Sequence, residues 1–389
     1  MGKRNTLIVN ILHIMNDGFR YTCILLLPFI ARDLRINLTS VGILGTAISI
    51  VEVFLSLFVG IIAFRIGSMR TLVLSLCMYT MGYILISSSR YFPVYIIAYV
   101  VAGMGFALYH PVANAIISRG AAHKKQGSAI GNFGAIGDIG RVAIPVVLTI
   151  SISLFGWRMS SVIISIVLIF CSMLLTYIFV LKKENNNLNK PIRSLTRYRH
   201  IIKNHKYILA SLCGVFDTFA NVGIVIYLPF LILQRYDNPI FLGVVTTAFF
   251  IGGIVGKKSL GQMVDTHGNA KTFIYSEILM ALLIVVLAWI PNLIVTFITS
   301  VMLGVVTKGT TPIVSAMVAD IHSEKESLEK VFGLTQFITA FALASSPFIV
   351  GYFSDHWGIN YAFMICAIVA LIATIPAVFF KANTNQLKS

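Results

Sequence analysis

Charged residues are scarce in this sequence, and acidic residues are the scarcest. Of the 389 residues only 11% are Asp, Glu, Lys or Arg, and 14 Asp and Glu stand against 30 Lys and Arg. A soluble domain usually carries about 25% charged residues. With 57% hydrophobic residues and a mean hydropathy of +0.88, the composition excludes an ordinary soluble protein and indicates a membrane protein with many spans.

Motifs for catalysis, cofactors and metals are also missing. The five cysteines lie inside apolar runs without metal-ligand spacing, so we expect small core residues. There is no nucleophile elbow, phosphate-binding glycine loop or metal-spaced His, Asp and Glu cluster, so we expect no enzyme, no cofactor and no metal. The net charge of +16 would suggest nucleic acid in a soluble protein, but topology explains it better here, and we expect no nucleic-acid partner.

Twelve apolar stretches are long enough to cross a bilayer. The links between these stretches are short, except for the basic, Asn-rich segment 182–206. It predicts a cytoplasmic linker between an N-terminal bundle, 1–181, and a C-terminal bundle, 207–389, each of six helices. The expected spans are 7–31, 39–63, 71–89, 93–117, 127–150, 158–181, 207–233, 239–258, 271–291, 293–319, 331–350 and 359–380.

Positive charge is distributed unevenly over the links between these spans. If the N-terminus is cytoplasmic, most Lys and Arg fall on the cytoplasmic side, including the eight of the linker. The outer links hold only Arg32, Arg35, Arg90, Arg158 and Arg235. By the positive-inside rule both termini are then cytoplasmic, and the protein is a multi-pass protein of the cell (plasma or inner) membrane.

The two halves repeat each other at one constant offset in the numbering. That offset relates Leu27-Pro28-Phe29 to Leu228-Pro229-Phe230, Gly42 to Gly243, Gly103 to Gly304 and Pro111 to Pro312. A single offset over four successive spans indicates duplication. Parallel repeats of this kind place the substrate site near mid-membrane, where the two repeats meet.

A loop motif after the second span occurs in both halves. It resembles the Gly-x-x-x-Asp-Arg-x-Gly-Arg-Arg signature of the major facilitator superfamily of secondary transporters. That resemblance implies an all-α membrane protein of twelve transmembrane helices, arranged as two pseudo-symmetric six-helix bundles, in which this loop holds a gate. Phe64 replaces the Asp in the first copy, which puts the usual lock in doubt. The matching positions are Gly60, Arg65, Gly67 and Arg70, and then Gly261, Asp265, Gly268 and Lys271.

The fourth span narrows the resemblance further. It contains the sequence Gly103-Met-Gly-Phe-Ala-Leu-Tyr-His110-Pro111, and the first span contains His13 and Asn16-Asp17. Both are similar to the fosmidomycin-resistance group of efflux transporters. The Arg that many drug/proton antiporters carry in the fourth helix is absent, with Tyr99 near its place. That absence argues against an ordinary multidrug transporter.

A polar stripe crosses the first span. His13, Asp17 and Arg20 stand at i, i+4 and i+7, so they share one helix face. A charge at mid-bilayer is expensive to keep, so such residues usually face protein or water. In the superfamily the first, fourth, seventh and tenth helices line the central cavity. From the repeat we expect Arg20 and Lys308 to meet an anion, and the substrate-binding set to be His13, Arg20, His110, Asn114, Asn221, Lys308 and Thr311.

Buried carboxyl groups are the candidate proton carriers, because burial disfavours their charged form. We rank Asp17 first, Glu52 second and Asp217 third. Asp138 and Arg141, at i and i+3, predict a buried ion pair, and we expect Glu277 and Asp320 to serve gating or solvation. The alternative for these groups is structural: they fix helix packing, and Arg20 pairs only with Asp17.

The leading hypothesis is a proton-coupled antiporter that exports a small anionic or zwitterionic molecule by alternating access. A proton-coupled uptake symporter for an organic acid or nutrient is the first alternative, because the same residues serve either direction. A membrane sensor or scaffold that has lost transport is the second alternative. The expected partners are the small-molecule substrate, protons and the lipid bilayer, and we expect a monomer.

Overall fold

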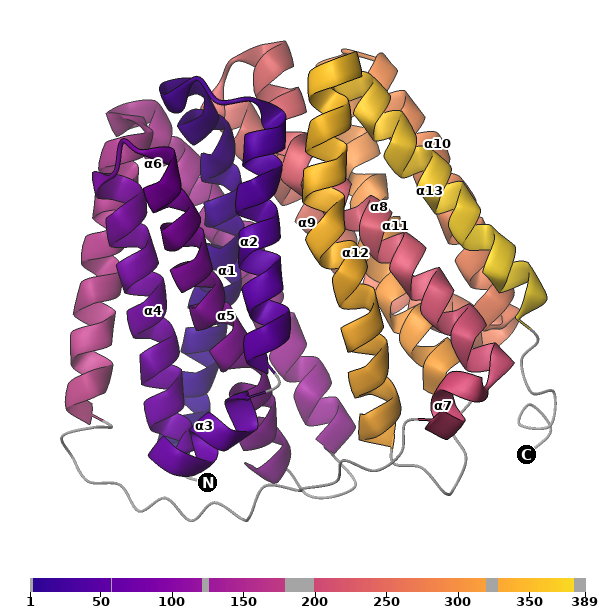
Figure 1. Cartoon of the computed structure of the whole chain (residues 1–389), viewed down its shortest axis with the longest axis horizontal. Helices are drawn as coiled ribbons and strands as arrows, with labels where there is room; N and C mark the ends of the chain where they lie inside the picture. The colour runs from indigo at the N-terminus through magenta and orange to yellow at the C-terminus, as the bar shows by residue number, and fades with distance from the viewer. Residues whose placement is uncertain (1–2, 57, 121–125, 179–198, 320–327, 381–389) are drawn as a thin grey trace. The chain divides into compact units, whose positions relative to one another are not determined.

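The computed structural model describes residues 3–56, 58–120, 126–178, 199–319 and 328–380. Every regular element in this part of the chain is a helix (Figure 1). The helices are α1 (Lys3–Leu34), α2 (Leu38–Ser56), α3 (Val59–Ile66), α4 (Ser68–Ser88), α5 (Phe92–Gly120), α6 (Gln126–Thr176), α7 (Arg199–Lys203), α8 (His205–Tyr236), α9 (Pro239–His267), α10 (Asn269–Trp289), α11 (Leu293–Ala319), α12 (Leu328–Trp357) and α13 (Ile359–Phe379).

These helices give the twelve predicted crossings, so the predicted fold class is confirmed. Helix α6 is 51 residues long and contains two spans that meet at Gly156, whose φ of 76° and ψ of 161° are not helical. Helices α2 and α3 share one predicted span, and α7 has only five residues, too few to cross a bilayer. Ten of the described helices are both long and apolar enough to span a membrane. Helix α1 has the length, at 32 residues, but a polar centre.

The helices group into two compact units. Unit 1 contains 1–36, 43–194 and 238–243, and unit 2 contains 37–42, 195–237 and 244–389. In unit 1 the closest pairs are α4 with α5 and α1 with α6; in unit 2 they are α10 with α13 and α8 with α13. Most of the predicted linker, residues 182–198, lies outside the described residues, and its last part forms α7. The division at 182–206 stays a prediction.

The sequence repeat recurs as repeated packing. A Cβ added to Gly103 on α5 would come within 2.9 Å of the Ile48 carbonyl oxygen on α2. In unit 2, Gly304 on α11 packs in the same way on the Phe249 carbonyl of α9. The offset of the repeat relates Gly103 to Gly304 and Ile48 to Phe249. Only glycine allows two helix backbones to approach this closely. Each unit therefore contains the same glycine-mediated helix crossing.

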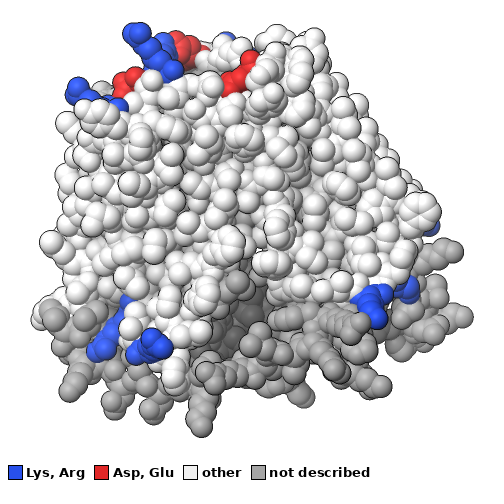
Figure 2. Space-filling view, viewed as in Figure 1, with Lys and Arg blue, Asp and Glu red and all other residues white. Residues whose placement is uncertain are grey.

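Apolar side chains cover the surface that faces the membrane. On the face shown in Figure 2, the coloured Lys, Arg, Asp and Glu gather at the ends of the helices, and the broad band between them is uncoloured. Large apolar side chains such as Leu154, Phe170 and Ile294 are 69%, 68% and 70% exposed. In water such a surface would be costly, but lipid tails cover it at no cost. The protein is a multi-pass membrane protein.

Candidate functional site

Asp17 on α1 is the centre of a buried polar cluster in unit 1. Its side chain is 1% exposed. The Oδ1 atom lies 3.0 Å from His110 Nε2 on α5 and accepts a 3.0 Å hydrogen bond from Asn16 Nδ2. The Oδ2 atom lies 3.3 Å from His13 Nε2 and 2.8 Å from Arg141 Nη2 on α6. Three helices therefore bring basic groups to one carboxylate, which satisfies the charge that the polar stripe of α1 places in the membrane.

Arg141 joins this carboxylate to a second one. Its Nη1 atom donates a 2.7 Å hydrogen bond to Asp138 Oδ1, one helical turn earlier on α6. The spacing predicted this Asp138–Arg141 contact, but not that the same guanidinium also bonds Asp17. An arginine has five donors in a planar fork, which suits it to bridge two carboxylates.

Arg20 finds its partner on a different helix from the one that its spacing suggested. Its Nε donates to Glu52 Oε1 at 2.9 Å and its Nη2 to Glu52 Oε2 at 2.8 Å, a bidentate pair between α1 and α2. The alternative that Arg20 pairs only with Asp17 is therefore wrong, because Arg20 bonds Glu52 directly. The guanidinium also lies 4.0 Å from the centre of the Phe106 ring. The Arg20 side chain stays 28% exposed, so one part of it is open.

The position of His13 is fixed on every side. Its Nδ1 lies 2.9 Å from the Phe133 carbonyl oxygen on α6, and its ring stacks on the Phe133 ring at a centroid distance of 3.9 Å. The glycine at 137 on α6 lies against the same ring: a Cβ there would come within 2.5 Å of His13 Nε2. His13 is 3% exposed, whereas the His110 side chain is 27% exposed. Of the two histidines, His110 is the one open to a ligand.

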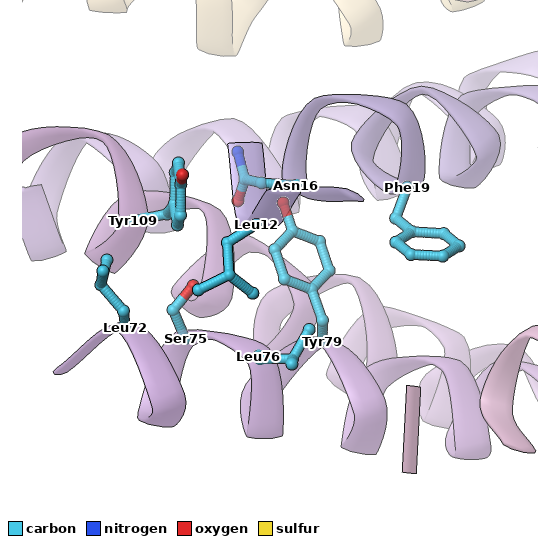
Figure 3. A pocket seen from close by; sticks show the side chains of 8 residues that line it. All are labelled: Leu12, Asn16, Phe19, Leu72, Ser75, Leu76, Tyr79 and Tyr109. Atoms are coloured by element: carbon cyan, nitrogen blue, oxygen red, sulfur yellow. The ribbon is translucent and has the colours of Figure 1, made fainter. Parts of the chain in front are cut away.

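A small pocket adjoins the cluster (Figure 3). It is lined by Leu12, Asn16, Phe19, Leu72, Ser75, Leu76, Tyr79 and Tyr109. In the close-up, the Tyr79 hydroxyl points from α4 toward α1, where Asn16 lies. The Tyr79 hydroxyl and the Asn16 Oδ1 atom are both buried without a hydrogen-bond partner among the described residues. These two unsatisfied groups therefore share one pocket with several apolar side chains.

Buried tyrosines hold α1 in place, a role that the sequence did not reveal. Tyr83 donates to the Phe19 carbonyl at 2.7 Å, Tyr99 to the Cys23 carbonyl at 2.6 Å and Tyr109 to the Val9 carbonyl at 2.7 Å. All three tyrosines are at most 2% exposed. These bonds from α4 and α5 fix the rotation of α1, and with it the direction of the Asp17 stripe.

Unit 2 has its own polar cluster around Asp217 on α8. Asp217 Oδ1 accepts a 2.7 Å hydrogen bond from Thr310 Oγ1 on α11 and a 2.9 Å bond from Asn221 Nδ2. Lys308 on α11 lies near enough to interact electrostatically with Asp217, and its Nζ is 5.7 Å from the centre of the Phe249 ring. The structure thus brings together Asp217, Asn221 and Lys308 from the predicted set.

Two predicted substrate-binding residues lie apart from these clusters. Asn114 on α5 and Thr311 on α11 are exposed, and neither side chain bonds the carboxylates described above. The Thr311 carbonyl accepts a 3.0 Å bond from the Ser315 hydroxyl of the next turn. A ligand contact at Asn114 or Thr311 stays a prediction.

The predicted gating loops share a backbone conformation. Gly67 between α3 and α4 has φ 97°, and Gly268 between α9 and α10 has φ 82°, a region that favours glycine. A Cβ at Gly60 or Gly261 would meet no atom within 4 Å. Among the described residues, no ion pair involves Arg65, Arg70, Asp265 or Lys271, and the Arg70 Nε atom is buried without a partner. Their gating role stays a prediction.

One group of side chains has the composition of a metal site. His13, Asp17 and His110 offer ligand atoms within 4.8 Å of one another, a set that many divalent metals accept. The Arg141 guanidinium already occupies Asp17 Oδ2 at 2.8 Å, and its positive charge opposes a cation at the same place. The arrangement therefore disfavours a metal cation at this carboxylate.

Comparison with known families covers nearly the whole chain. A family model described as Major Facilitator Superfamily matches residues 9–242 and 210–388. The chain belongs to the Major Facilitator Superfamily. This confirms the predicted superfamily; membership of the fosmidomycin-resistance group stays a prediction.

Individual members of the superfamily are more distant. The riboflavin transporter RibZ of Clostridioides difficile (strain 630) is 23% identical, with 92% of this chain and 93% of that protein covered. Multidrug resistance protein 2 of Bacillus subtilis (strain 168) is 26% identical over 182 residues, covering 46% of this chain and 44% of that protein.

Two solved structures show the same fold. The nucleoside transporter NupG superposes with a TM-score of 0.80 at 11% identity, covering 96% of this chain and 99% of that one. A bacterial homolog of the human lysosomal transporter Spinster, in an inward-facing and unoccupied conformation, superposes with a TM-score of 0.74 at 13% identity, covering 96% of both chains. The chain is therefore a membrane transporter by family, with the shared fold spanning its full length.

Proposed function

We propose that this protein is a proton-coupled secondary transporter of a small anionic or zwitterionic molecule, working in export by proton antiport. It acts as a monomer in the cell membrane with both termini cytoplasmic. The observation that carries the proposal is the buried cluster of unit 1. With neutral histidines it holds three acids, Asp17, Glu52 and Asp138, and two arginines, Arg20 and Arg141.

This charge balance makes the cluster sensitive to protons. One negative charge is in excess, so a single proton on His13, His110 or a carboxyl brings the cluster to neutrality. Buried clusters avoid net charge, because an uncompensated charge is costly in a low dielectric. A histidine changes its charge near physiological pH, and a desolvated carboxyl is drawn toward its neutral form. We propose Asp17 and Glu52 as the main proton carriers and Asp217 as the third.

The open faces of the same cluster suit an anion. Arg20, His110 and Arg141 keep 28%, 27% and 27% of their side chains exposed, whereas the acids between them are almost fully covered. A carboxylate or phosphonate that arrives there meets hydrogen-bond donors in a fork that matches its own oxygens. We therefore propose Arg20 as the anion-binding charge of unit 1, with His110 beside it and with Lys308 as the charge of unit 2.

One contact favours the alternative of uptake by proton symport. Glu52 occupies the edge of Arg20 formed by Nε and Nη2, which an anion would also use. An anion can take that place when Glu52 is neutral, so the proton and the anion would bind together. Binding together leads to movement in the same direction, which is symport. Export by antiport needs the proton to enter after the anion has left, with Glu52 returning to Arg20 in between.

Transport in proteoliposomes tests the proposal. An imposed pH gradient is applied in each direction while flux is followed for phosphonates, carboxylates, cationic dyes, riboflavin and nucleosides; the last two represent the substrates in the relatives' names. We expect proton-linked flux of an anion or zwitterion that falls at least tenfold in Arg20→Ala and in Lys308→Ala, with the exposed Arg90→Ala as the matched control. Proton-linked flux of cations alone, unaffected by these variants, would show that the anion site is wrong.

The direction of the gradient separates the candidates. Accumulation toward the more alkaline side indicates symport, and accumulation toward the more acidic side indicates antiport. No flux for any compound class, with a folded protein, would favour a sensor or scaffold that has lost transport.

A further inference from the structure

Asp217 does not stand alone in unit 2, because an acid on a neighbouring helix faces it. Glu277 on α10 is 0% exposed and Asp217 is 5% exposed. Their two carboxyl groups lie near enough to interact with each other. The sequence led us to expect Glu277 in gating or solvation; its complete burial excludes solvation. Asp320 lies outside the described residues.

The two carboxyls have very different hydrogen-bond environments. Asp217 accepts bonds from Thr310 and Asn221 at 2.7 and 2.9 Å. In the described part of the chain no donor reaches either oxygen of Glu277. Two ionised carboxylates cannot hydrogen-bond each other, since both are acceptors only. A bond between them requires one proton, and the group without donors is the one that holds it. Glu277 is then the acid, and it donates to the Asp217 carboxylate.

The surrounding charges agree with a single proton. Two like charges in contact inside a protein cannot both be kept. Lys308 on α11 is a cation that acts on Asp217, and the Cys213 thiol on α8 is a further titratable group beside the pair. Lys308 balances one negative charge. Among the described residues nothing balances a second one on Glu277.

The repeat shows that the acid pair is particular to unit 2. At the offset that relates the two halves, Asp217, Glu277 and Thr310 correspond to Asn16, Leu76 and Tyr109 of unit 1. Those three residues line the small pocket of Figure 3, and none of them is acidic. The shared helix packing therefore does not demand an acid at either position. A buried pair of carboxyl groups that helix packing does not require points to a ligand.

We propose that Asp217 and Glu277 form a binding site for one proton, which Glu277 carries and donates to Asp217 beside Lys308. The inference deepens the proposed function, since it gives unit 2 a proton site of its own. Loss of that proton would leave two adjacent carboxylates and draw Lys308 toward them, and so away from an anion. Occupation of the pair can be measured without any transport.

Infrared spectroscopy of the purified full-length protein tests the proposal. At neutral pH we expect a protonated-carboxyl C=O band that shifts in D2O and that is lost in Glu277→Gln. Asp265→Asn, which changes an exposed carboxyl group outside the pair, serves as the control and leaves the band unchanged. Asp217→Asn is the second variant: the band persists there but moves in frequency, because an amide replaces the carboxylate acceptor.

Two results would overturn the proposal. The first is an unchanged band in Glu277→Gln together with an unmoved band in Asp217→Asn. The second is loss of the wild-type band when Na⁺ replaces K⁺ at constant pH, which would assign the pair to a metal cation. Failure of the proposed function looks different: proteoliposomes show no proton-linked flux, while the infrared band still depends on Glu277.

Discussion

The Arg20–Glu52 pair makes the sharpest prediction, which concerns Glu52→Gln. The substitution keeps the shape of the side chain and removes its charge for good. In the native protein an anion must compete with the Glu52 carboxylate for the Nε and Nη2 atoms of Arg20, bonded at 2.9 and 2.8 Å. In the variant Arg20 has lost its permanent counter-charge and is available at every pH.

The size of the effect follows from the geometry. Removing one partner of a fully buried ion pair costs about 3–5 kcal/mol. Here the Arg20 side chain is 28% exposed, and the glutamine oxygen still accepts one of the two hydrogen bonds. One charge-assisted bond is worth about 1.5–3 kcal/mol, so we expect stability to fall by about 2 kcal/mol. An anion that restores the lost bond gains the same amount, which corresponds to roughly 30-fold tighter binding.

Binding and flux are measured on the same purified variant. Binding of the transported anion is followed by thermal shift at several pH values, because a ligand stabilises the state to which it binds. We expect Glu52→Gln to bind tightly with little pH dependence, to keep exchange of labelled for unlabelled anion, and to lose accumulation driven by a pH gradient. The control is Asp33→Asn, which removes the partner of Arg158 near the end of α1 and beside the break of α6 at Gly156, and should leave flux unchanged.

A specific result would refute this reasoning. If Glu52→Gln accumulates the anion under a pH gradient as well as the wild type, and binds it with unchanged affinity, then Glu52 neither carries the proton nor competes for Arg20. The pair would then serve packing between α1 and α2 alone.

Three further substitutions test the packing of the two clusters by thermal unfolding in detergent. Asp17→Asn removes the charge that three basic side chains share, and we expect a loss of about 3 kcal/mol and of flux; full flux would show that the cluster is only structural. Gly304→Ala places a methyl group against the backbone of α9 and should lower stability by about 1–3 kcal/mol. Gly134→Ala is the control and should leave stability unchanged, because the added methyl group meets open space. Thr310→Val removes a hydrogen-bond donor to the buried Asp217 carboxylate on α8 and should lower stability by about 1.5–3 kcal/mol. Thr339→Val is the control, because the Thr339 hydroxyl bonds carbonyls of its own helix. Equal losses of stability in both variants would contradict the reasoning.

The fold was predictable from the sequence because bilayer length and the repeat are one-dimensional signals. Twelve apolar stretches, the glycine loop motif in both halves and the constant offset between the halves correctly indicated two related sets of helices. Even the pairing of Gly103 with Gly304 anticipated two equivalent helix crossings. The break inside α6 at Gly156 was visible only as a short link between two spans.

Contacts along one helix were also readable, but contacts between helices were not. The i, i+4 spacing of His13 and Asp17 corresponds to a 3.3 Å contact. The partner of Arg20, by contrast, lies on α2, and that of Glu277 lies two helices earlier in the chain, on α8. Such pairs depend on the rotation of each helix about its axis, which for α1 is set by buried tyrosine bonds to its carbonyls. No local pattern reports that rotation.

The two halves of the protein hold their acids one residue out of step. Asp17 follows Asn16 in the first half, whereas Asp217 takes the place of Asn16 in the second. One residue turns a side chain by about 100° around a helix axis. Asp17 thus turns toward α5 and α6, and Asp217 toward α10 and α11. The same helix face therefore holds different chemistry in the two halves on a shared frame. Exchanging Asn16 and Asp17 alone would not carry the second chemistry into the first half, because Leu76 stands where the second half has Glu277.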